Sequence, residues 1–347
     1  MTQRIYQIDY IKTFAIVSVV TVHFLLNSGF YDIKIGSWIS SADVVLRIIF
    51  ITAVPIFIMT TGFLMGNKKL SSSYIVKLFH VLEIYVAVSL IDWVGQAILL
   101  SKQLSLTDAL YGLLDFSTDS YSWYVEMYIG LYLIIPLLNA AWHFQKDDQY
   151  HIYIVSITFI LFFLPSLFNT FGKIIPDWWV SGYPIGYYYV GMYFKEHLED
   201  IKQISLKVLS CYALVVFGTI AIIELNNNTG KVFEWTNENE YMGYQPFVIA
   251  VILFLLMLRL PVKRPDRKRY RILAAISSMT LSIYLFSDLT DSIIYHYFKQ
   301  TIHSIESRLY FGPIIVFLSF TMVVLCAFIL QRLLEILAKN KVKQVNS

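Results

Sequence analysis

Long apolar runs, separated by short polar loops, make up most of this chain. Each run is roughly 20 residues long, which is the length that crosses the hydrocarbon core of a bilayer. The pattern predicts an all-α polytopic membrane protein with about ten transmembrane helices. The runs cover residues 8–26, 44–66, 75–100, 123–141, 151–168, 179–194, 206–224, 245–260, 272–296 and 311–337.

The composition supports a membrane protein and argues against several other classes. Of the 347 residues, 57% are hydrophobic and only 15% are charged, whereas soluble domains carry about 25% charged residues. The net charge of +3 gives no support for a nucleic-acid-binding protein. Both cysteines, Cys211 and Cys326, lie inside apolar runs. We therefore expect no disulfide framework and no metal site.

The distribution of basic residues predicts how the helices are oriented. Lysine and arginine are concentrated in alternate loops, including the basic segment 259–271, and near both ends of the chain. Because such loops stay on the cytoplasmic side, we expect both termini there and interpret segment 259–271 as a topology anchor rather than a site for an anionic ligand. Residues 1–347 are then one membrane-embedded domain, with residues 338–347 as a cytoplasmic tail.

The first apolar run contains two polar groups, Lys12 and His23. They lie eleven positions apart, which on an ideal helix is three turns plus about 20°, so the two side chains share a face about 16 Å apart. Titratable groups in lipid are costly and usually functional. The alternative is that Lys12 reaches the inner surface and His23 forms an interhelical hydrogen bond.

The same run, "IDYIKTFAIVSVVTVHF", resembles the signature of the integral membrane acyltransferase-3 family. That signature is a basic residue, ten residues and a histidine on the first membrane helix, with Asp9, Lys12 and His23 at the matching positions here. Arginine is commoner than lysine at the basic position. Similar segments follow in family order: "VPIFIMTTGFLM" (54–65), "KLFHVLEIYV" (77–86), "WYVEMYIGLYLIIPLLN" (123–139), "YYYVGMYF" (187–194) and "SSMTLSIYLFSDL" (277–289). His80 replaces the second residue of a basic pair, and Ser287 stands where many members have histidine.

The resemblance implies a function, because members of this family acylate, and usually acetylate, carbohydrates of the bacterial envelope. We expect a stand-alone membrane module in the bacterial cytoplasmic membrane, among membrane lipids. It would be an O-acetyltransferase that moves an acyl group from cytoplasmic acetyl-coenzyme A to a hydroxyl of a cell-envelope polysaccharide or its lipid-linked precursor.

Two other functions remain open. The first is a transporter or flippase for a glycan or a lipid-linked sugar, which inverted repeats or paired broken helices would favour; the sequence shows neither. The second is a structural partner of a synthase, which accounts for neither the shared face of Lys12 and His23 nor the ordered matches.

The chemistry of acyl transfer assigns provisional roles to the residues of the outer half. The acceptor hydroxyl must lose a proton to a base, or a nucleophile must hold the acyl group. Neutral imidazole serves near neutral pH, because its ordinary pKa is about 6.5. We predict His23 in one of these roles. Glu126, Asp288 and Asp291 share its predicted depth, so one of them would orient the ring, and we assign Glu126 and Asp288 to the site.

The donor requires cations at the inner surface, because the phosphates of coenzyme A are polyanionic. Lys12 is the family-matched candidate, and Lys77 and His80 are weaker ones. A lysine pairs with phosphate as a point charge and lacks the planar fork of arginine.

Overall fold

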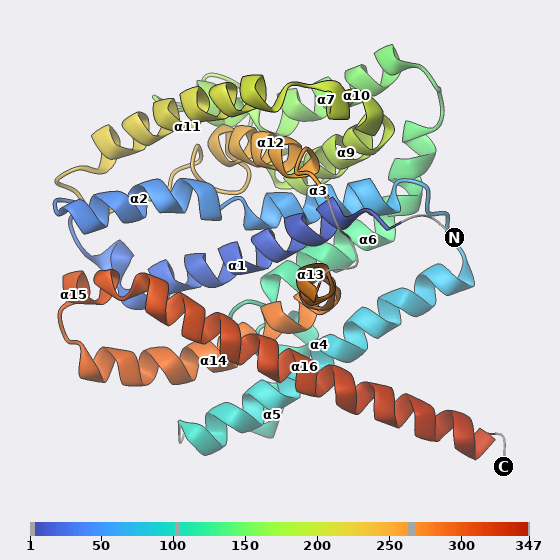
Figure 1. Ribbon diagram of the computed structural model, residues 1–347, viewed down its shortest axis with the longest axis vertical. Helices are drawn as coiled ribbons and strands as arrows, with labels where there is room; N and C mark the ends of the chain where they lie inside the picture. Colours follow the sequence, from blue (N-terminus) through green and yellow to red (C-terminus); the bar gives the residue numbers. More distant parts are fainter. Residues whose placement is uncertain (1–3, 101–104, 263–267, 346–347) are drawn as a thin grey trace.

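The computed structural model describes residues 4–100, 105–262 and 268–345, with the side chains up to residue 336. The regular elements of this part of the chain are all helices, and its only extended pairings are two isolated bridges, Lys34 with Val232 and Ile35 with Thr229 (Figure 1). The helices are α1 (Tyr6–Ser28), η1 (Phe30–Asp32), α2 (Trp38–Phe50), α3 (Ala53–Met65), α4 (Ser72–Leu99), α5 (Leu106–Asp115), α6 (Trp123–Trp142), α7 (Asp148–Phe162), α8 (Leu164–Phe168), η2 (Val180–Gly182), α9 (Tyr183–Glu196), α10 (Leu198–Gln203), α11 (Leu206–Asn228), α12 (Tyr244–Leu258), α13 (Lys268–Ser278), α14 (Thr280–Thr301), α15 (Ile305–Tyr310) and α16 (Gly312–Val345).

Every predicted apolar run is helical, but not every run is long enough to count as a membrane span. Among the described residues, six helical segments are long and apolar enough to cross a bilayer, or seven if the bent pair α13–α14 counts as one span. Helices α7, α9 and α12 have only 15, 14 and 15 residues. The all-α membrane class is therefore supported, whereas ten spans remain a prediction.

The structure corrects the sequence analysis at a broken helix. The apolar run 272–296 predicts one membrane helix, but it is divided between α13 and α14, which meet at an angle of 71°. The break falls at Met279, between the last residue of α13 and the first of α14. A break in a membrane helix exposes backbone groups, so neighbouring side chains must bind them.

Two segments that carry the family resemblance pack against each other in α3 and α9. A Cβ atom added to Gly62 would lie 1.9 Å from the carbonyl oxygen of Tyr188, and one added to Gly191 would lie 2.0 Å from that of Met59. Small residues allow membrane helices to approach this closely. The glycines of "TTGFLM" and "YYYVGMYF" therefore determine the spacing of these two helices.

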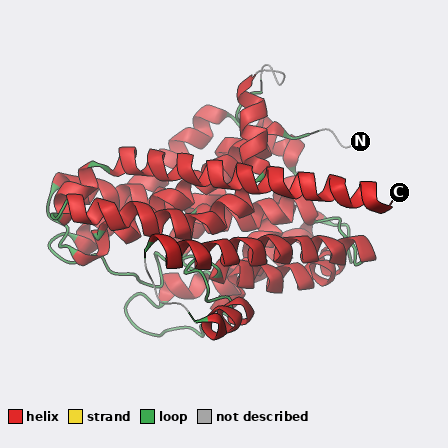
Figure 2. Cartoon of the chain, turned by 90° about the horizontal axis from the view of Figure 1, so that it is seen from below, coloured by secondary structure: helices red, strands yellow, loops and turns green. Residues whose placement is uncertain are grey.

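Both chain ends emerge on the same side of the helical bundle (Figures 1 and 2). This arrangement suits an even number of crossings, and the cytoplasmic location of the ends remains a prediction. The expected tail, 338–347, continues α16 as far as Val345. Residues 346–347, and residues 263–267 of the basic segment, lie outside the described residues.

Candidate active site

Lys12 binds the broken helix. Its side chain is half-buried, and its Nζ donates a hydrogen bond to the backbone oxygen of Ser277, in the last turn of α13. The last carbonyls of a helix have no partner within the helix and carry partial negative charge, so a cation is favourable there. Lys12 thus fastens α1 to the break, and its ammonium keeps two further donors.

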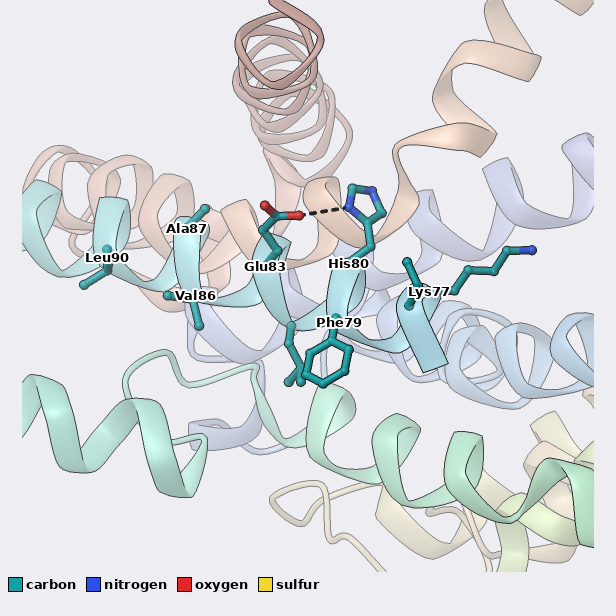
Figure 3. A pocket seen from close by; sticks show the side chains of 9 residues that line it. Lys77, Phe79, His80, Glu83, Val86, Ala87 and Leu90 are labelled. Atoms are coloured by element: carbon teal, nitrogen blue, oxygen red, sulfur yellow. Dashed lines mark hydrogen bonds and ion pairs between the residues drawn. The ribbon is translucent and has the colours of Figure 1, made fainter. Parts of the chain in front are cut away.

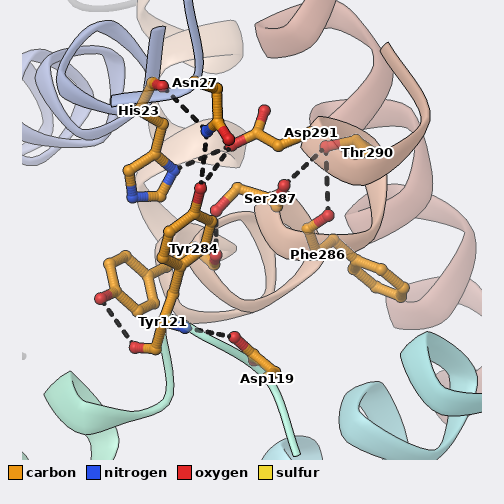
Figure 4. Close-up of polar contacts among 9 residues, drawn as sticks. All are labelled: His23, Asn27, Asp119, Tyr121, Tyr284, Phe286, Ser287, Thr290 and Asp291. Carbon is orange, nitrogen blue, oxygen red and sulfur yellow. Dashed lines mark hydrogen bonds and ion pairs between the residues drawn. The ribbon is translucent and has the colours of Figure 1, made fainter. Parts of the chain in front are cut away.

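His23 is held on three sides by polar and aromatic groups (Figure 4). It is buried, and its Nδ1 lies 3.1 Å from Oδ2 of Asp291, close enough for an ion pair when the ring is protonated. The ring of Tyr121 stacks on the imidazole, with ring centroids 3.6 Å apart and an interplanar angle of 19°. The described residues form no hydrogen bond with Nε2, which leaves this nitrogen available for chemistry.

Asn27 and Tyr121 complete a small network around the ring. Asn27 lies one turn after His23 on α1, and its Nδ2 donates to the His23 backbone oxygen at 2.9 Å and to Tyr121 Oη at 3.0 Å. Tyr121 Oη in turn donates to Asp291 Oδ2 at 3.1 Å. The carboxylate that faces His23 is therefore fixed from a second direction, which orients it toward the ring.

A short segment between α5 and α6 carries Tyr121 into the bundle. Phe116 begins it with a left-handed backbone, at a φ of 59°. Asp119 then accepts hydrogen bonds from the Tyr121 backbone N–H at 2.7 Å and from Ser122 Oγ at 3.0 Å. Burial raises the pKa of Asp119 to about 7, and the neighbouring Asp288 adds to the increase. The segment thus depends on a carboxyl group that titrates near neutral pH.

The predicted carboxylates lie in different places. Asp288 is buried three residues before Asp291, and it accepts a hydrogen bond from Gln96 Nε2 at 3.2 Å. The side chain of Glu126 is exposed. In the described part of the chain neither forms an ion pair or hydrogen bond with His23, and Asp291 occupies the position expected of the orienting carboxylate. The residues of α14 that face α1 depend on how α14 is rotated, which the sequence does not specify.

Ser287 stands where many family members have histidine. Its Oγ donates to the Tyr284 backbone oxygen at 2.5 Å, and Thr290 Oγ1 bonds similarly to Phe286 and Ser287 (Figure 4). Both hydroxyls therefore bind the backbone of their own helix, as serine and threonine commonly do in membrane helices. Ser287 adds no group to the His23 network.

Two cavities lie along the shared face of α1. The cavity at His23 has a volume of about 50 Å³, and aromatic side chains form much of its wall: Tyr121, Trp123, Tyr241 and Tyr284. The cavity at Lys12 is larger, about 350 Å³, and it is lined by hydroxyl and aromatic groups that include Thr61, Ser278 and Tyr284. Tyr284 borders both cavities.

A family model described as an acyltransferase domain matches residues 5–332, nearly the whole chain. The chain belongs to the acyltransferase-3 family. Comparisons with curated proteins and with solved structures gave no significant match. The resemblance seen in the sequence is thus confirmed, and family membership supports acyl transfer to a glycan-type acceptor in general terms.

The two weaker donor-binding candidates of this acyltransferase lie on α4, and only one borders the Lys12 cavity. His80 lines that cavity, and its Nδ1 lies 3.3 Å from Glu83 Oε2 (Figure 3). Lys77 lines a second, open hollow of about 1010 Å³, which His80 also borders and whose walls are all residues of α4. Lys12 and His80 therefore border one space, and Lys77 is not part of it.

No group of three or more histidine, cysteine, aspartate or glutamate side chains in the described ranges is arranged to hold a metal ion. The candidate site consists of His23, Asp291, Tyr121 and Asn27 beside two cavities. Sequence reasoning proposed His23 and named Asp291 among three carboxylates, but it did not propose Tyr121 or Asn27. Asn27 lies one turn after His23, and that spacing is a signal which points to it.

Proposed function

We propose that this protein transfers an acetyl group from cytoplasmic acetyl-coenzyme A to a hydroxyl of a cell-envelope polysaccharide or its lipid-linked precursor. The observation that carries the proposal is the buried pair of His23 and Asp291 beside a cavity, in a chain of the acyltransferase-3 family. A histidine oriented by a carboxylate is the usual arrangement for activating a hydroxyl.

His23 acts through Nε2, because Nδ1 faces Asp291. As a general base, Nε2 takes the proton of the acceptor hydroxyl while the hydroxyl oxygen attacks the thioester carbonyl. The carbon–sulfur bond then breaks, and the thiol of coenzyme A leaves with the proton. As an acyl carrier, Nε2 attacks the thioester carbonyl, the carbon–sulfur bond breaks and the thiolate of coenzyme A leaves. The acceptor hydroxyl oxygen then attacks the acyl carbon, the bond between Nε2 and the acyl group breaks, and the hydroxyl proton passes to the thiolate. In both routes Asp291 stabilises the positive charge on the ring.

The donor occupies the Lys12 cavity in this proposal. The cavity is large enough for a narrow chain, and Lys12 lines it. With both termini on the cytoplasmic side, Lys12 supplies a cation near the cytoplasmic end of α1. His80 lies at its edge with an exposed side chain. Tyr284 separates this space from His23, so the thioester passes the Tyr284 ring to reach Nε2.

The broken helix α13–α14 is the one feature that favours the alternative of a transporter, since half-helix ends line many transport sites. Within the described residues this is a single bent pair rather than two related ones. Acyl transfer accounts for both the His23 network and the family match, so we favour it.

The test compares envelope glycans from cells that lack the gene and cells that carry either the wild type or His23→Ala. Mass spectrometry of the glycans should show O-acetyl groups only with the wild type. Equal amounts of both proteins in the membrane are the necessary control. If acetylation is the same in all three strains while a glycan fails to reach the surface, the protein is a transporter instead.

A further inference from the structure

The two cavities share one lining side chain, which forms the wall between them and lies near the start of α14. Tyr284 is only 4% exposed, yet it borders both the Lys12 cavity and the His23 cavity. Its ring centroid lies 6.3 Å from that of His23 and 5.1 Å from that of Tyr124. An acyl group that moves from the donor cavity to His23 must therefore pass this ring.

The Tyr284 ring is held in place by its hydroxyl group. Its Oη donates a hydrogen bond of 2.8 Å to the backbone oxygen of Tyr121, the residue that stacks on His23 (Figure 4). Packing against Tyr124 supports the ring from another side. The wall is thus attached to the network that orients the imidazole, and its position relative to His23 is well defined.

The two spaces differ sevenfold in volume, about 350 Å³ on the Lys12 side and about 50 Å³ on the His23 side. A single water needs roughly 10–15 Å³ of such a space, so the cavity at His23 has room for only a few non-hydrogen atoms. An acetyl group has three. Each methylene added to the acyl chain would need space that Tyr284 and Tyr121 occupy.

We propose that Tyr284 is the specificity-determining residue that limits the acyl group to the smallest chains. This inference rests on the proposed function, because it concerns the donor of that same reaction. The thioester lies at the edge of the Tyr284 ring, its coenzyme arm in the Lys12 cavity and its acyl tail in the small cavity at His23. Removing the ring joins the two spaces and gives longer tails somewhere to lie.

The experiment measures kcat/KM for acetyl-, propionyl- and butyryl-coenzyme A with a glycan acceptor in membranes that contain the full chain. The wild type should strongly prefer the acetyl donor. Tyr284→Ala should raise the ratio of butyryl to acetyl transfer by roughly ten- to a hundredfold, the range by which a pocket discriminates a chain-length difference of this kind. Tyr284→Phe keeps the ring and should retain the wild-type ratio, even if its overall rate falls.

Tyr128→Ala is the matched control, because Tyr128 lines the Lys12 cavity but not the His23 cavity. It enlarges the donor side and leaves the wall intact, so the chain-length ratio should stay at the wild-type value. If Tyr284→Ala does not accumulate in membranes, Tyr284→Leu makes the same test with a smaller loss of packing.

Two results would overturn the inference. One is an active Tyr284→Leu or Tyr284→Ala protein with an unchanged ratio, and the other is an equal shift in Tyr128→Ala. A wild-type preparation that transfers no acyl group from any of the three donors would overturn the proposed function itself. The two failures are therefore distinguishable.

Discussion

Two of the buried clusters of charged side chains in the described part of the chain make a useful comparison, because one borders the candidate active site and the other does not. Around Arg47 of α2, which is 1% exposed, the guanidinium lies over the rings of Trp235 and Phe233, 4.1 and 4.4 Å from their centroids. Its Nε donates to Tyr31 Oη at 2.9 Å. This cluster fastens the loop between α11 and α12 to α2 and η1.

The carboxylate of the Arg47 cluster is Glu224, and both of its oxygens accept hydrogen bonds. Asn239 links the two charges, because its Oδ1 accepts from Arg47 at 3.4 Å and its Nδ2 donates to Glu224 at 3.3 Å. Glu224 also accepts from Gln245 Nε2 at 2.8 Å. Each charged group has its partners, as buried charges require for stability.

The His23 cluster is incomplete by comparison. Within the described residues, Oδ1 of Asp291 and Nδ1 of His23 are buried without a hydrogen-bond partner, although this Nδ1 lies 3.1 Å from the other oxygen of Asp291. The His23 ring also borders a cavity. Unsatisfied polar groups are costly and are retained mainly where they do chemistry. Burial of charge therefore does not distinguish a structural cluster from a reactive one. Polar atoms that lack hydrogen-bond partners and lie beside a cavity do distinguish them.

The largest expected effect is on catalysis by the His23 cluster. His23→Ala should lower acyl transfer in purified membranes by about 10³-fold or more, since a positioned base or carrier contributes on this scale. The unfolding temperature in detergent should stay near that of the wild type. A variant that retains wild-type turnover would show that this ring does not act in the reaction.

The Arg47 cluster should show the opposite pattern. Arg47→Ala removes the buried cation that Asn239 links to Glu224, together with the hydrogen bonds to Tyr31 and Asn239. It should lower the free energy of unfolding by about 3–5 kcal/mol, the cost of leaving a buried charge uncompensated. Activity per folded molecule should change little. Arg47→Lys is the matched variant: it keeps the charge but not the planar fork, so an intermediate loss of stability is expected. Thermal unfolding measures the stability and turnover measures the activity of the same preparations. An Arg47→Ala protein that is fully stable but inactive would show that the Arg47 cluster takes part in the reaction.

A smaller effect on turnover should show which carboxylate acts on His23. Asp291→Asn keeps the shape but removes the charge that stabilises protonated His23, and it should reduce turnover by about 10²-fold and shift the pH profile. Glu126→Gln is the control on an exposed side chain and should have turnover within about twofold of the wild type. If Glu126→Gln is the more damaging of the two, the site uses a different carboxylate from the one that faces the ring.

The effect of Asp119 should appear only when the pH changes. Burial raises the pKa of the folded-state Asp119 to about 7, from an ordinary value of 3.8. The folded state therefore holds this proton more tightly than the unfolded state, so stability falls as pH rises from about 4 to about 7, by at most about 1.4 kcal/mol per pH unit. Asp119→Asn should flatten that part of the stability profile. Thermal unfolding between pH 5 and 8 measures it, and an unchanged slope in the variant would assign the dependence to other groups.

The positions of the main helices and the shared face of Lys12 and His23 could be predicted from the sequence, because both depend on local geometry. The apolar runs placed the main helices, because a bilayer requires long apolar segments. The eleven-residue spacing placed Lys12 and His23 on one face of α1, because the helical repeat is a property of the backbone. The ordered motifs also identified the family.

The tertiary structure decided which groups meet. Glu126, Asp288 and Asp291 were equivalent by depth, and only the rotation of α14 against α1 selected Asp291. Tyr121 lies 98 positions from His23 along the chain and stacks on it because Phe116 and Asp119 turn its segment inward. The break before Thr280 and the Tyr284 wall likewise depend on packing between helices. Apolar periodicity records that a segment is buried, but it does not record which neighbour the segment is buried against.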